Sequence, residues 1–482
     1  MKSLILPVRL EDRSLIKVVL STAKKRKIKL YLVGGYLRDI LLGREKDNPD
    51  IDFCLKRGAI NFGKDVARKL KGGFVILDKT HGCSRVVKRI NDKTYTLDFT
   101  DFRGKTLEAD LLHRDFTINA LSIELEKLFL TKNIKDLIID PYKGREDLKS
   151  KIIRFVNKKA FDEDPLRVLR AFSLAIIFDF KIDKETLRAI KLKARGLSGV
   201  SYERIRDELF KILERPGSFS YLEQLDKLKI LKIIIPEVEV MRGVKQGPYH
   251  HLDVWQHTLE TIRQLELLIT ELMNNHKIQD YLDEIISPTR SRRALIKLGA
   301  LLHDTGKPAA KRHEDGKTKF HGHERIGADI TGNIAGRLKL SNDETDSLEK
   351  MVLWHLRPGY LADNEEITPR AIFRYFRDTQ KEGVSILLIS LADQRATKGP
   401  LTSKASRIHH EKVATNLIKE YFRRKKEKKL PRLINGDDLM KKFKLEPSPL
   451  IGKILREIEE LQAIGKIKSK KAALQSAQKF IK

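Results

Sequence analysis

The sequence predicts an α+β multidomain protein in which an α/β head is followed by regions built from helices. Short runs rich in β-branched and aromatic residues gather within residues 1–150, and segments of helical spacing separate them. After residue 150 such runs almost vanish, and apolar residues recur at helical spacing instead. The chain has 482 residues, which is too long for one hydrophobic core and predicts two to four domains.

The candidate strands lie in the head. A β-rich run at residues 28–33 ends in Gly34-Gly35, and YLRDILLG then has helical spacing. DIDFCL, at residues 50–55, is a second candidate strand. Three further candidates are GFVILD, SRVVKRI and TYTLDFTDF.

The rest of the chain is expected to be helical. DPLRVLRAFSLAII, DKETLRAIKLKA and SYERIRDELFKILE all have helical spacing. We expect a helical neck at residues 151–244, a histidine-rich helical domain at 245–420 and a basic helical region at 421–482. The charged segment YFRRKKEKKLPR is the candidate linker between the last two.

The composition favours a polyanionic partner. The net charge is +31, so nucleic acid is the first candidate and an anionic membrane the second. The alternative is a lysine-rich composition without functional meaning. Cys54 and Cys83 are the two cysteines and no CxxC is present, which fits a reducing compartment. No stretch approaches the roughly 20 apolar residues of a membrane span, so we expect a cytoplasmic protein without membrane contact.

Asp50 and Asp52 form a candidate catalytic pair. In a strand, the period of two places both carboxylates on one face. Adjacent carboxylates can hold the Mg²⁺ ions of two-metal chemistry, in which one ion activates an attacking hydroxyl and the other bridges a triphosphate. The alternative is two solvent-facing acids on an edge strand. Asp98, in TYTLDFTDF, is either a third acid or an ordinary strand residue.

Gly34-Gly35 lies at a strand-to-helix turn, sixteen residues before Asp50. Glycine lets the backbone approach a phosphate, and a helix amino terminus favours negative charge. The alternative is a tight turn. The order of strand, GG, helix and DxD resembles the polymerase-β-like nucleotidyltransferase superfamily.

Further motifs give a narrower resemblance. HRDFTINALSI and DEDPLRVLRAF resemble the RRDFTINA and EDxLRxxRA motifs of class II tRNA nucleotidyltransferases and bacterial poly(A) polymerases. DPYKGREDLKSKIIR and SYERIRDEL resemble the connecting motif and the later helix of the same family. The segment from GDDLMKKF to the end resembles its tRNA-binding tail, so the resemblance covers nearly the whole chain.

The resemblance implies a polymerase-β-like head that uses Mg²⁺, with tRNA as partner and CTP and ATP as substrates. Arg114 would meet the triphosphate, Asp115 would accept from a ribose hydroxyl, and Asn119 would order the site. The family usually has a second arginine where this chain has His113, which places a phosphate role at that position in doubt. The implied nucleotide-binding residues are Gly34, Gly35, Arg38, Arg114, Asp115, Asn119, Asp164, Arg167 and Arg170.

Asp164 and Arg167 are the candidate base-reading pair. They are three residues apart on an expected helix, which would make their side chains neighbours. Cytosine and adenine share an amino donor beside a ring-nitrogen acceptor, and uracil and guanine reverse this order. One carboxylate and one guanidinium could therefore accept C and A and reject U and G. The alternative is that Asp164 caps the helix and Arg167 forms a surface ion pair.

The segment between Arg103 and Asp110 contains only six residues, GKTLEA. By the resemblance, CCA-adding members usually carry a longer flexible segment here, and CC-adding relatives lack it. We therefore expect addition of only the two cytidines.

The second half of the chain resembles the HD phosphohydrolase superfamily. His303-Asp304 can offer a metal a nitrogen and an oxygen, and His257 and Asp393 would complete the H…HD…D set. His323 and His355 could hold a second divalent transition metal, whose hydroxide could attack a phosphoester. The alternative is a helical scaffold that has kept its ligands by descent.

These patterns together predict a tRNA nucleotidyltransferase that adds CC or CCA without a nucleic-acid template and releases pyrophosphate. One alternative is a poly(A) polymerase with the same head. A second is a metal-dependent phosphohydrolase whose head only binds RNA, and a third is a non-catalytic tRNA-binding protein.

Overall fold

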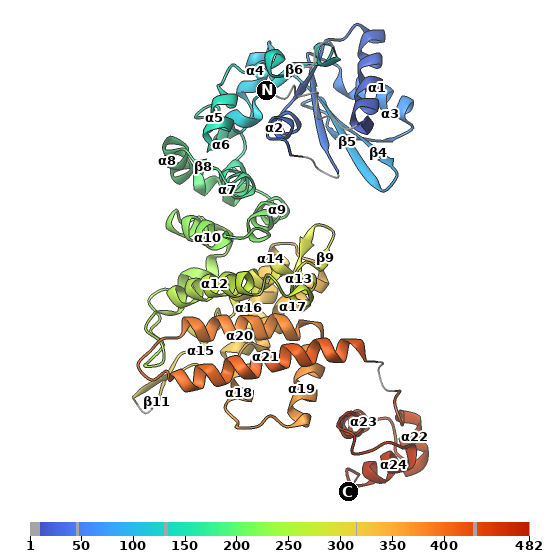
Figure 1. The fold of residues 1–482 in the computed structure, drawn as a ribbon, viewed down its shortest axis with the longest axis vertical. Helices are drawn as coiled ribbons and strands as arrows, with labels where there is room; N and C mark the ends of the chain where they lie inside the picture. The colour runs from blue at the N-terminus through green and yellow to red at the C-terminus, as the bar shows by residue number, and fades with distance from the viewer. Residues whose placement is uncertain (1–9, 45–47, 130–133, 315, 428–430, 482) are drawn as a thin grey trace. The chain divides into compact units, whose positions relative to one another are not determined.

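The chain divides into two units in the computed structural model, which describes residues 10–44, 48–129, 134–314, 316–427 and 431–481. Figure 1 shows the ribbon coloured along the chain. The first unit is Met1–Ile212 with Leu228–Ile233, and the second is Leu213–Lys227 with Ile234–Lys482.

A six-stranded sheet forms the centre of the first unit, in the order β3-β4-β5-β2-β1-β6. β2 and β5 pair in parallel, and the other neighbouring pairs are antiparallel. The five predicted strands are confirmed and β6 is an addition. The mixed sheet of the head, together with the helical regions that follow, confirms the predicted α+β multidomain fold. The strands are β1 (Leu30–Val33), β2 (Asp50–Leu55), β3 (Gly73–Asp78), β4 (Cys83–Ile90), β5 (Lys93–Asp101) and β6 (Ser122–Glu124).

The two faces of this sheet have different roles. Phe53 of β2 stacks on Phe99 of β5 at 5.2 Å, and Phe62 of α3 (Ala59–Leu70) meets Phe99 edge-on, also at 5.2 Å. α1 (Leu10–Arg26) packs against α3 (Figure 1). Because side chains alternate along β2, burying Phe53 turns the neighbouring aspartates to the opposite face.

Short helices complete the first unit. α7 begins at Arg167, three residues later than the DPLR pattern predicts. A two-residue parallel pair, β7 (Ile152–Ile153) with β8 (Lys181–Ile182), corrects the expectation of an all-helical neck. The helices are α2 (Gly35–Leu41), α4 (Leu107–Leu112), α5 (Gly144–Ser150), α6 (Ala160–Glu163), α7 (Arg167–Phe178), α8 (Lys184–Lys193) and α9 (Tyr202–Leu213).

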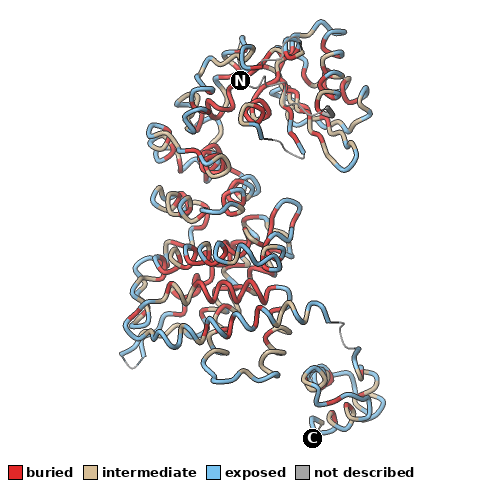
Figure 2. Tube along the Cα trace, in the orientation of Figure 1, coloured by how far each residue is buried: buried red, intermediate tan, exposed pale blue. Residues whose placement is uncertain are grey.

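The second unit is a helical bundle. Its central helix, α20 (Gly383–Ala396), is apolar around most of its circumference and is buried along most of its length (Figure 2). Two hairpins are additions to the predicted helices: β9 (Ile285–Ser287) with β10 (Arg290–Ser291), and β11 (Arg312–Glu314) with β12 (Lys317–Lys319). The helices around α20 are α12 (Val254–Glu271), α14 (Arg292–Leu302), α16 (His323–Arg337), α17 (Asn342–Trp354), α18 (Arg357–Ala362), α19 (Pro369–Thr379) and α21 (Lys404–Lys426).

The predicted linker at residues 421–432 is partly wrong. Tyr421 to Lys426 continue α21, because this stretch keeps apolar residues on the packed side of the helix. Three helices follow, α22 (Gly436–Phe443), α23 (Pro449–Ala463) and α24 (Lys470–Gln478), and they share a core of their own that includes Leu439, Ile454 and Ile458. Among the described residues, no helix has both the length and the apolar composition needed to cross a membrane.

Candidate active sites

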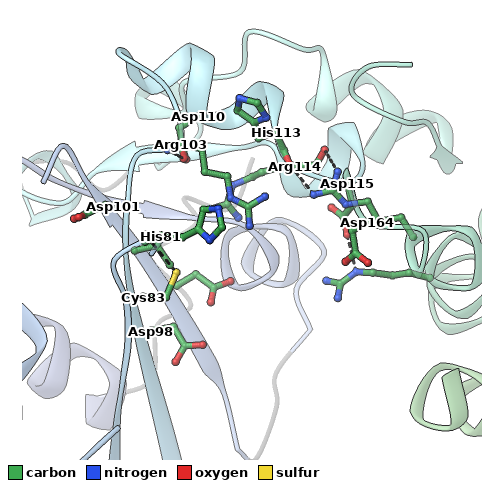
Figure 3. A pocket seen from close by; sticks show the side chains of 14 residues that line it. His81, Cys83, Asp98, Asp101, Arg103, Asp110, His113, Arg114, Asp115 and Asp164 are labelled. Atoms are coloured by element: carbon green, nitrogen blue, oxygen red, sulfur yellow. Dashed lines mark hydrogen bonds and ion pairs between the residues drawn. The ribbon is translucent and has the colours of Figure 1, made fainter. Parts of the chain in front are cut away.

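A cavity of about 270 Å³ opens on the aspartate face of the head sheet. Figure 3 shows its side chains, with Asp98 on the sheet and Asp164 on the helical side. The cavity is lined by Asp52, His81, Cys83, Asp98, Thr100, Asp101, Arg103, Asp110, His113, Arg114, Asp115, Asp164, Arg167 and Arg170.

The predicted carboxylates share one face of the sheet. Asp50 is exposed, while Asp52 is partly buried and lines the cavity. Asp98 lies directly opposite Asp52 in the parallel β2–β5 pair. The Arg85 guanidinium donates to both oxygens of Asp98, each at 2.8 Å. Asp98, the third candidate acid, therefore lies beside Asp52 and forms an ion pair with Arg85.

The charge on Asp52 is unfavourable in the protein alone. The pKa of Asp52 is raised to about 6, because its burial and the nearby charges of Asp98 and Asp50 together outweigh the opposing charge of Arg114. A carboxylate in such surroundings gains most from a bound cation, and oxygen ligands suit Mg²⁺. The donor set at Asp50 and Asp52 thus fits a divalent cation.

Gly34 makes room for the two charged groups of the cavity. Its φ is 77°, and an added Cβ would lie 2.7 Å from Nη1 of Arg114 and 3.0 Å from Oδ2 of Asp52. Its own N–H donates to the Leu121 carbonyl at 3.1 Å. Glycine is required here because the side chains approach the backbone, and the N–H is used within the head. At Gly35 a Cβ would lie 3.3 Å from Arg38.

Arg114 has the features of an anion-binding group. It lines the cavity, and its Nε is buried without a hydrogen-bond partner among the described residues. Buried polar groups are nearly always bonded, so an unpartnered guanidinium N–H beside an open cavity indicates a missing ligand. An oxyanion such as a phosphate is the natural partner of a guanidinium.

A relay of hydrogen bonds supports the nucleotide side of the cavity. Nη1 of Arg38 donates to Oδ1 of Asn119 at 2.5 Å, and Nδ2 of Asn119 donates to Asp115 at 3.0 Å. Nε of Arg170 reaches Asp115 at 2.6 Å. Asp115 and Arg170 line the cavity, whereas Arg38 is buried and stacks on Phe178 at 4.3 Å. Arg38 and Asn119 therefore lie behind the groups that face the cavity.

Asp115 stays ionised despite its burial. Burial alone would raise its pKa, but the Arg170 charge and the hydrogen bonds from Asn119 and the Phe116 N–H outweigh it and lower the pKa below its ordinary value. An ionised carboxylate only accepts hydrogen bonds. Asp115 is thus prepared to accept a hydrogen bond from a hydroxyl group in the cavity.

Asp164 and Arg167 both line the cavity, but the prediction that they share one helix is wrong. α6 ends at Glu163, Asp164 has extended backbone with φ of −149°, and α7 begins at Arg167. The cause is Pro165, because the residue before a proline is disfavoured in the helical region. Asp164 accepts from Nη2 of Arg204 at 2.7 Å.

Arg167 is held by the backbone. Its Nη2 donates to the His113 carbonyl at 2.6 Å, and its Nη1 donates to the Ala160 carbonyl at 3.0 Å. Its side chain is only 8% exposed, so the alternative of a surface ion pair is wrong. The buried guanidinium is fixed at the cavity wall, with Glu163 nearby at 3.6 Å.

Several residues in or beside the cavity were not in the predicted set. Arg204, which contacts Asp164 without lining the cavity, had a signal because it belongs to the SYERIRDEL motif. His81 lies in the β3–β4 turn and Cys83 begins β4, and no pattern in the sequence points to them. The unusual His113 binds Glu163 at 2.9 Å through Nδ1.

The GKTLEA segment is short and closely tied. The Arg103 N–H donates to Oδ1 of Asp110 at 2.9 Å, which joins its two ends. Thr106 caps α4 by accepting from the Ala109 N–H at 3.2 Å. Half of the segment is therefore part of a capped helix.

The second unit brings all six predicted histidine and aspartate ligands together. They lie at helix ends and on helices α12 and α20, where apolar neighbours pack around them. Two groups have ligand atoms within 4.8 Å of one another, and both are buried. They are His257, His303 and Asp304, and Asp304, His323 and His355. Asp393 joins them by contacting Nε2 of His257 at 2.8 Å.

Asp304 is shared by the two groups. Its Oδ2 lies 3.2 Å from Nε2 of His303 and 3.8 Å from Nε2 of His257. Its Oδ1 lies 3.4 Å from Nε2 of His323 and 3.8 Å from Nε2 of His355. Each carboxylate oxygen thus faces its own pair of imidazoles, which is the arrangement of a ligand that bridges two cations.

The imidazoles are oriented for metal binding. Nδ1 of His303, His323 and His355 each lies 2.7 to 2.8 Å from the carbonyl three residues earlier. Such bonds fix the ring and turn Nε2 toward the centre. Nε2 of His303 and Oδ1 of Asp304 are buried without a hydrogen-bond partner among the described residues. This donor set fits a divalent transition metal.

Two of the six candidate ligands, His355 and Asp393, have protonation states that suit a metal. Burial lowers the pKa of His355 to about 3, which leaves the imidazole neutral. Burial would raise the pKa of Asp393, but the hydrogen bond and charge of His257 hold it well below its usual range. Metal ligands must be neutral imidazoles and ionised carboxylates.

Family models match successive parts of the chain. The poly A polymerase head domain matches residues 30–154, and "Probable RNA and SrmB- binding site of polymerase A" matches 179–241. The HD domain matches residues 254–379, and tRNA nucleotidyltransferase domain 2 matches 333–477.

Curated relatives match over most of their length. The chain is 30% identical to an A-adding tRNA nucleotidyltransferase of Deinococcus radiodurans over 448 residues, which are 90% of this chain and 92% of the relative. It is 29% identical to a CC-adding tRNA nucleotidyltransferase of Thermus thermophilus, covering 92% of this chain and 91% of the relative. A solved Thermotoga maritima CCA-adding enzyme complexed with tRNA has a similar fold, with a TM-score of 0.64, 22% identity, and coverage of 100% of this chain and 98% of that one.

Proposed function

The chain belongs to the tRNA nucleotidyltransferase family, and we propose that it adds cytidylates from CTP to the 3′ end of tRNA without a nucleic-acid template, releasing pyrophosphate. The observation that carries this proposal is the head cavity. It places the Asp52 carboxylate, the Arg114 guanidinium and the Asp164–Arg167 pair around one volume of about 270 Å³, and Nε of Arg114 has no hydrogen-bond partner among the described residues. A site for nucleotidyl transfer needs ligands for a metal, a group that binds the phosphates and groups that recognise the base. Asp52, Arg114 and the Asp164–Arg167 pair can serve these three roles.

The residues in and beside the cavity have different roles in the proposed reaction. Asp50 and Asp52 would hold Mg²⁺, which when bound activates the tRNA 3′-hydroxyl and neutralises the triphosphate. Arg114 and Arg170 face the phosphates, so their charges stabilise the negative charge that develops at the α-phosphate. Asp115 accepts the hydrogen bond of a ribose hydroxyl, since it is ionised and fixed by its neighbours.

The base is read by Asp164 and Arg167. Arg167 donates to the ring-nitrogen acceptor and Asp164 accepts from the exocyclic amino group, an edge that C and A share. The backbone carbonyls around Arg167 fix its guanidinium, and Arg204 fixes the Asp164 carboxylate. Because these contacts exist before a nucleotide binds, protein side chains can replace a template strand.

The short GKTLEA segment supports a stop after the second cytidine. C and A differ in size, so a pocket that takes both in turn must change shape. The tie between Arg103 and Asp110 and the capped α4 leave little chain for this change.

A second candidate is addition of the terminal A alone. It is favoured by the 30% identity to the A-adding relative, which matches the chain slightly better than the CC-adding relative does. The two candidates differ in primer as well as in nucleotide.

Primer extension separates the candidates. The purified protein receives tRNA that lacks CCA with CTP, and in parallel tRNA that ends in CC with ATP. Two added residues in the first reaction and none in the second support CC addition. The reverse supports A addition, and a long A tail on any RNA would indicate a poly(A) polymerase.

We also propose that the histidine centre is a metal-dependent phosphohydrolase site. The supporting observation is the pair of buried, unpartnered ligand atoms, Nε2 of His303 and Oδ1 of Asp304. If no metal bound here, the free-energy cost of burying these two atoms without hydrogen bonds would not be offset. The test is the metal content of the purified protein, together with metal-dependent hydrolysis of cyclic nucleotides.

A further inference from the structure

Three polar side chains face the histidine centre from outside its candidate ligand set. Gln246 and His250 belong to the segment 243–253 that precedes α12, and Lys307 begins α15 (Lys307–Ala310). None of the three belongs to the two candidate metal-ligand groups. They therefore need an explanation other than metal ligation.

Lys307 joins the centre to the segment 243–253. Its Nζ lies 2.6 Å from Oδ2 of Asp304 and 2.6 Å from Oε1 of Gln246. Both Lys307 and Gln246 are only 8% exposed. A buried ammonium thus lies directly beside the carboxylate that the two ligand groups share.

His250 is an unsatisfied group at the same place. Its ring packs edge-on against that of His257, with centroids 4.8 Å apart. Its Nδ1 is buried without a hydrogen-bond partner among the described residues. In His303 and His323, by contrast, Nδ1 is bonded to a backbone carbonyl. His250 has no such bond and is not a candidate ligand, so the hydrogen bond of its Nδ1 is not supplied by the described residues.

The segment that carries Gln246 and His250 is fixed rather than loose. The Val254 N–H donates to the Val244 carbonyl at 3.1 Å, and the Gly399 N–H donates to the Tyr249 carbonyl at 2.8 Å. A Cβ at Gly399 would lie 2.2 Å from the Tyr249 carbonyl carbon, so only glycine allows this approach. The segment forms a rigid wall beside the centre.

We propose that Gln246, His250 and Lys307 form a phosphate-binding wall, which holds the oxygens of a phosphate ester against the metals of the histidine centre. The inference rests on the proposed phosphohydrolase function and names its substrate-binding residues. An ammonium, an amide and an imidazole together supply positive charge and several donors, the chemistry that a phosphate oxygen needs. If a metal bound Asp304, it would share the carboxylate charge that Lys307 contacts, and the Lys307 ammonium could then interact with the phosphate.

Inorganic phosphate is the probe. The full-length protein is loaded with Mn²⁺ and titrated with phosphate by calorimetry, with metal content measured by mass spectrometry. The test variants are His250→Ala and Gln246→Leu, and the control is His251→Ala, because His251 is the exposed neighbour of His250. We expect at least tenfold weaker phosphate binding in both test variants, with metal content unchanged, and wild-type binding in the control.

His250→Asn provides a second variant in case the alanine variant unfolds, since the asparagine amide can occupy the place of Nδ1. Thermal melting identifies folded variants, and His250→Asn should recover most of the phosphate affinity. Loss of metal in His250→Ala would overturn the proposal by making His250 a ligand. Unchanged phosphate affinity in folded, metal-loaded variants would overturn it as well. If the wild type binds phosphate but hydrolyses no ester, the proposed hydrolase function fails while the binding wall stands.

Discussion

The head cavity and the histidine centre both contain candidate metal-binding carboxylates, but these carboxylates differ in how deeply they are buried. In the head, Asp50 is exposed, and Asp52 is partly buried and lines an open cavity. In the second unit, Asp304 is 1% exposed and is surrounded by oriented imidazoles. Under the proposed function, the head cavity must admit a nucleotide and an RNA end, so its contacts are complete only when these substrates are bound. The histidine centre has a complete ligand set before any substrate arrives.

The difference is also visible in how each site is supported. Asp164 is fixed by the Arg204 side chain, and the Arg167 guanidinium is fixed by two backbone carbonyls. His303 and His323 are fixed by carbonyls of their own chain segments, and their Nε2 atoms face the Asp304 carboxylate. The groups proposed to select the base are thus held in place beside an open cavity, whereas the candidate metal ligands are gathered around one position.

Replacing Asp50 or Asp52 with Asn should have the largest effect. A metal contributes several kcal/mol to the transition state, so we expect nucleotide addition to fall by roughly a thousandfold or more. The tRNA affinity should change little, because the proposal gives these carboxylates a role in holding the metal and not in binding RNA. Single-turnover rates and filter binding measure the two effects. Normal turnover in either variant would remove the two-metal assignment.

The double variant His303→Ala with Asp304→Ala should separate the two sites. It removes members of both ligand groups, so we expect loss of bound metal and of phosphoester hydrolysis. Nucleotide addition should stay within about twofold of wild type, because none of its residues are altered. Metal analysis, hydrolysis and primer extension on the same preparation decide the outcome. Hydrolysis that survives in the double variant would contradict the assignment of this centre.

Arg167→Ala should damage selection more than tRNA binding. A base contact is worth roughly 1–3 kcal/mol, so the preference for CTP over UTP should fall by roughly 10- to 100-fold. Lys193→Ala is a matched control, since Lys193 is a half-exposed cation that forms an ion pair with Asp162. Competition between CTP and UTP measures the ratio. A wild-type preference in Arg167→Ala would show that the base is read elsewhere.

The smallest effect is expected from pH. Because the pKa of Asp52 is raised to about 6, protons compete with Mg²⁺ below that value. The apparent Mg²⁺ affinity should weaken about tenfold between pH 7 and pH 5. The folded state binds this proton more tightly than the unfolded chain does, so the contribution of Asp52 to stability falls as pH rises from about 4 to 6. Asp52→Asn should therefore melt slightly higher at pH 7 without metal, and an Mg²⁺ dependence that ignores pH would contradict the raised pKa.

Much of both sites could be predicted from local pattern. DIDFCL gives β2 its observed bounds, and alternation places Asp50 and Asp52 on one face. The motifs identify His303 and His355 as candidate ligands, whereas their positions just after the ends of α14 and α17 come from the structure. The error at Asp164 was avoidable, because Pro165 disfavours a helical conformation before it.

Other features depend on tertiary packing that no local pattern records. Arg38 lies in a motif that suggests a nucleotide contact, yet Phe178 and Asn119 from distant segments enclose it. His81 reaches the cavity only because the β3–β4 turn lies above the aspartate face. The role of GKTLEA stays a prediction, since its short, tied structure is compatible with a stop after CC and does not measure it.

The most direct measurement of protein-templated addition is sequencing of the product ends. The protein receives tRNA that lacks CCA together with all four nucleoside triphosphates, and the added residues are read. We predict that most products end in CC, with U and G nearly absent. A complete CCA end would contradict the stop after CC and leave base selection intact. Long A tails, or U and G at the frequency of C, would contradict selection by Asp164 and Arg167.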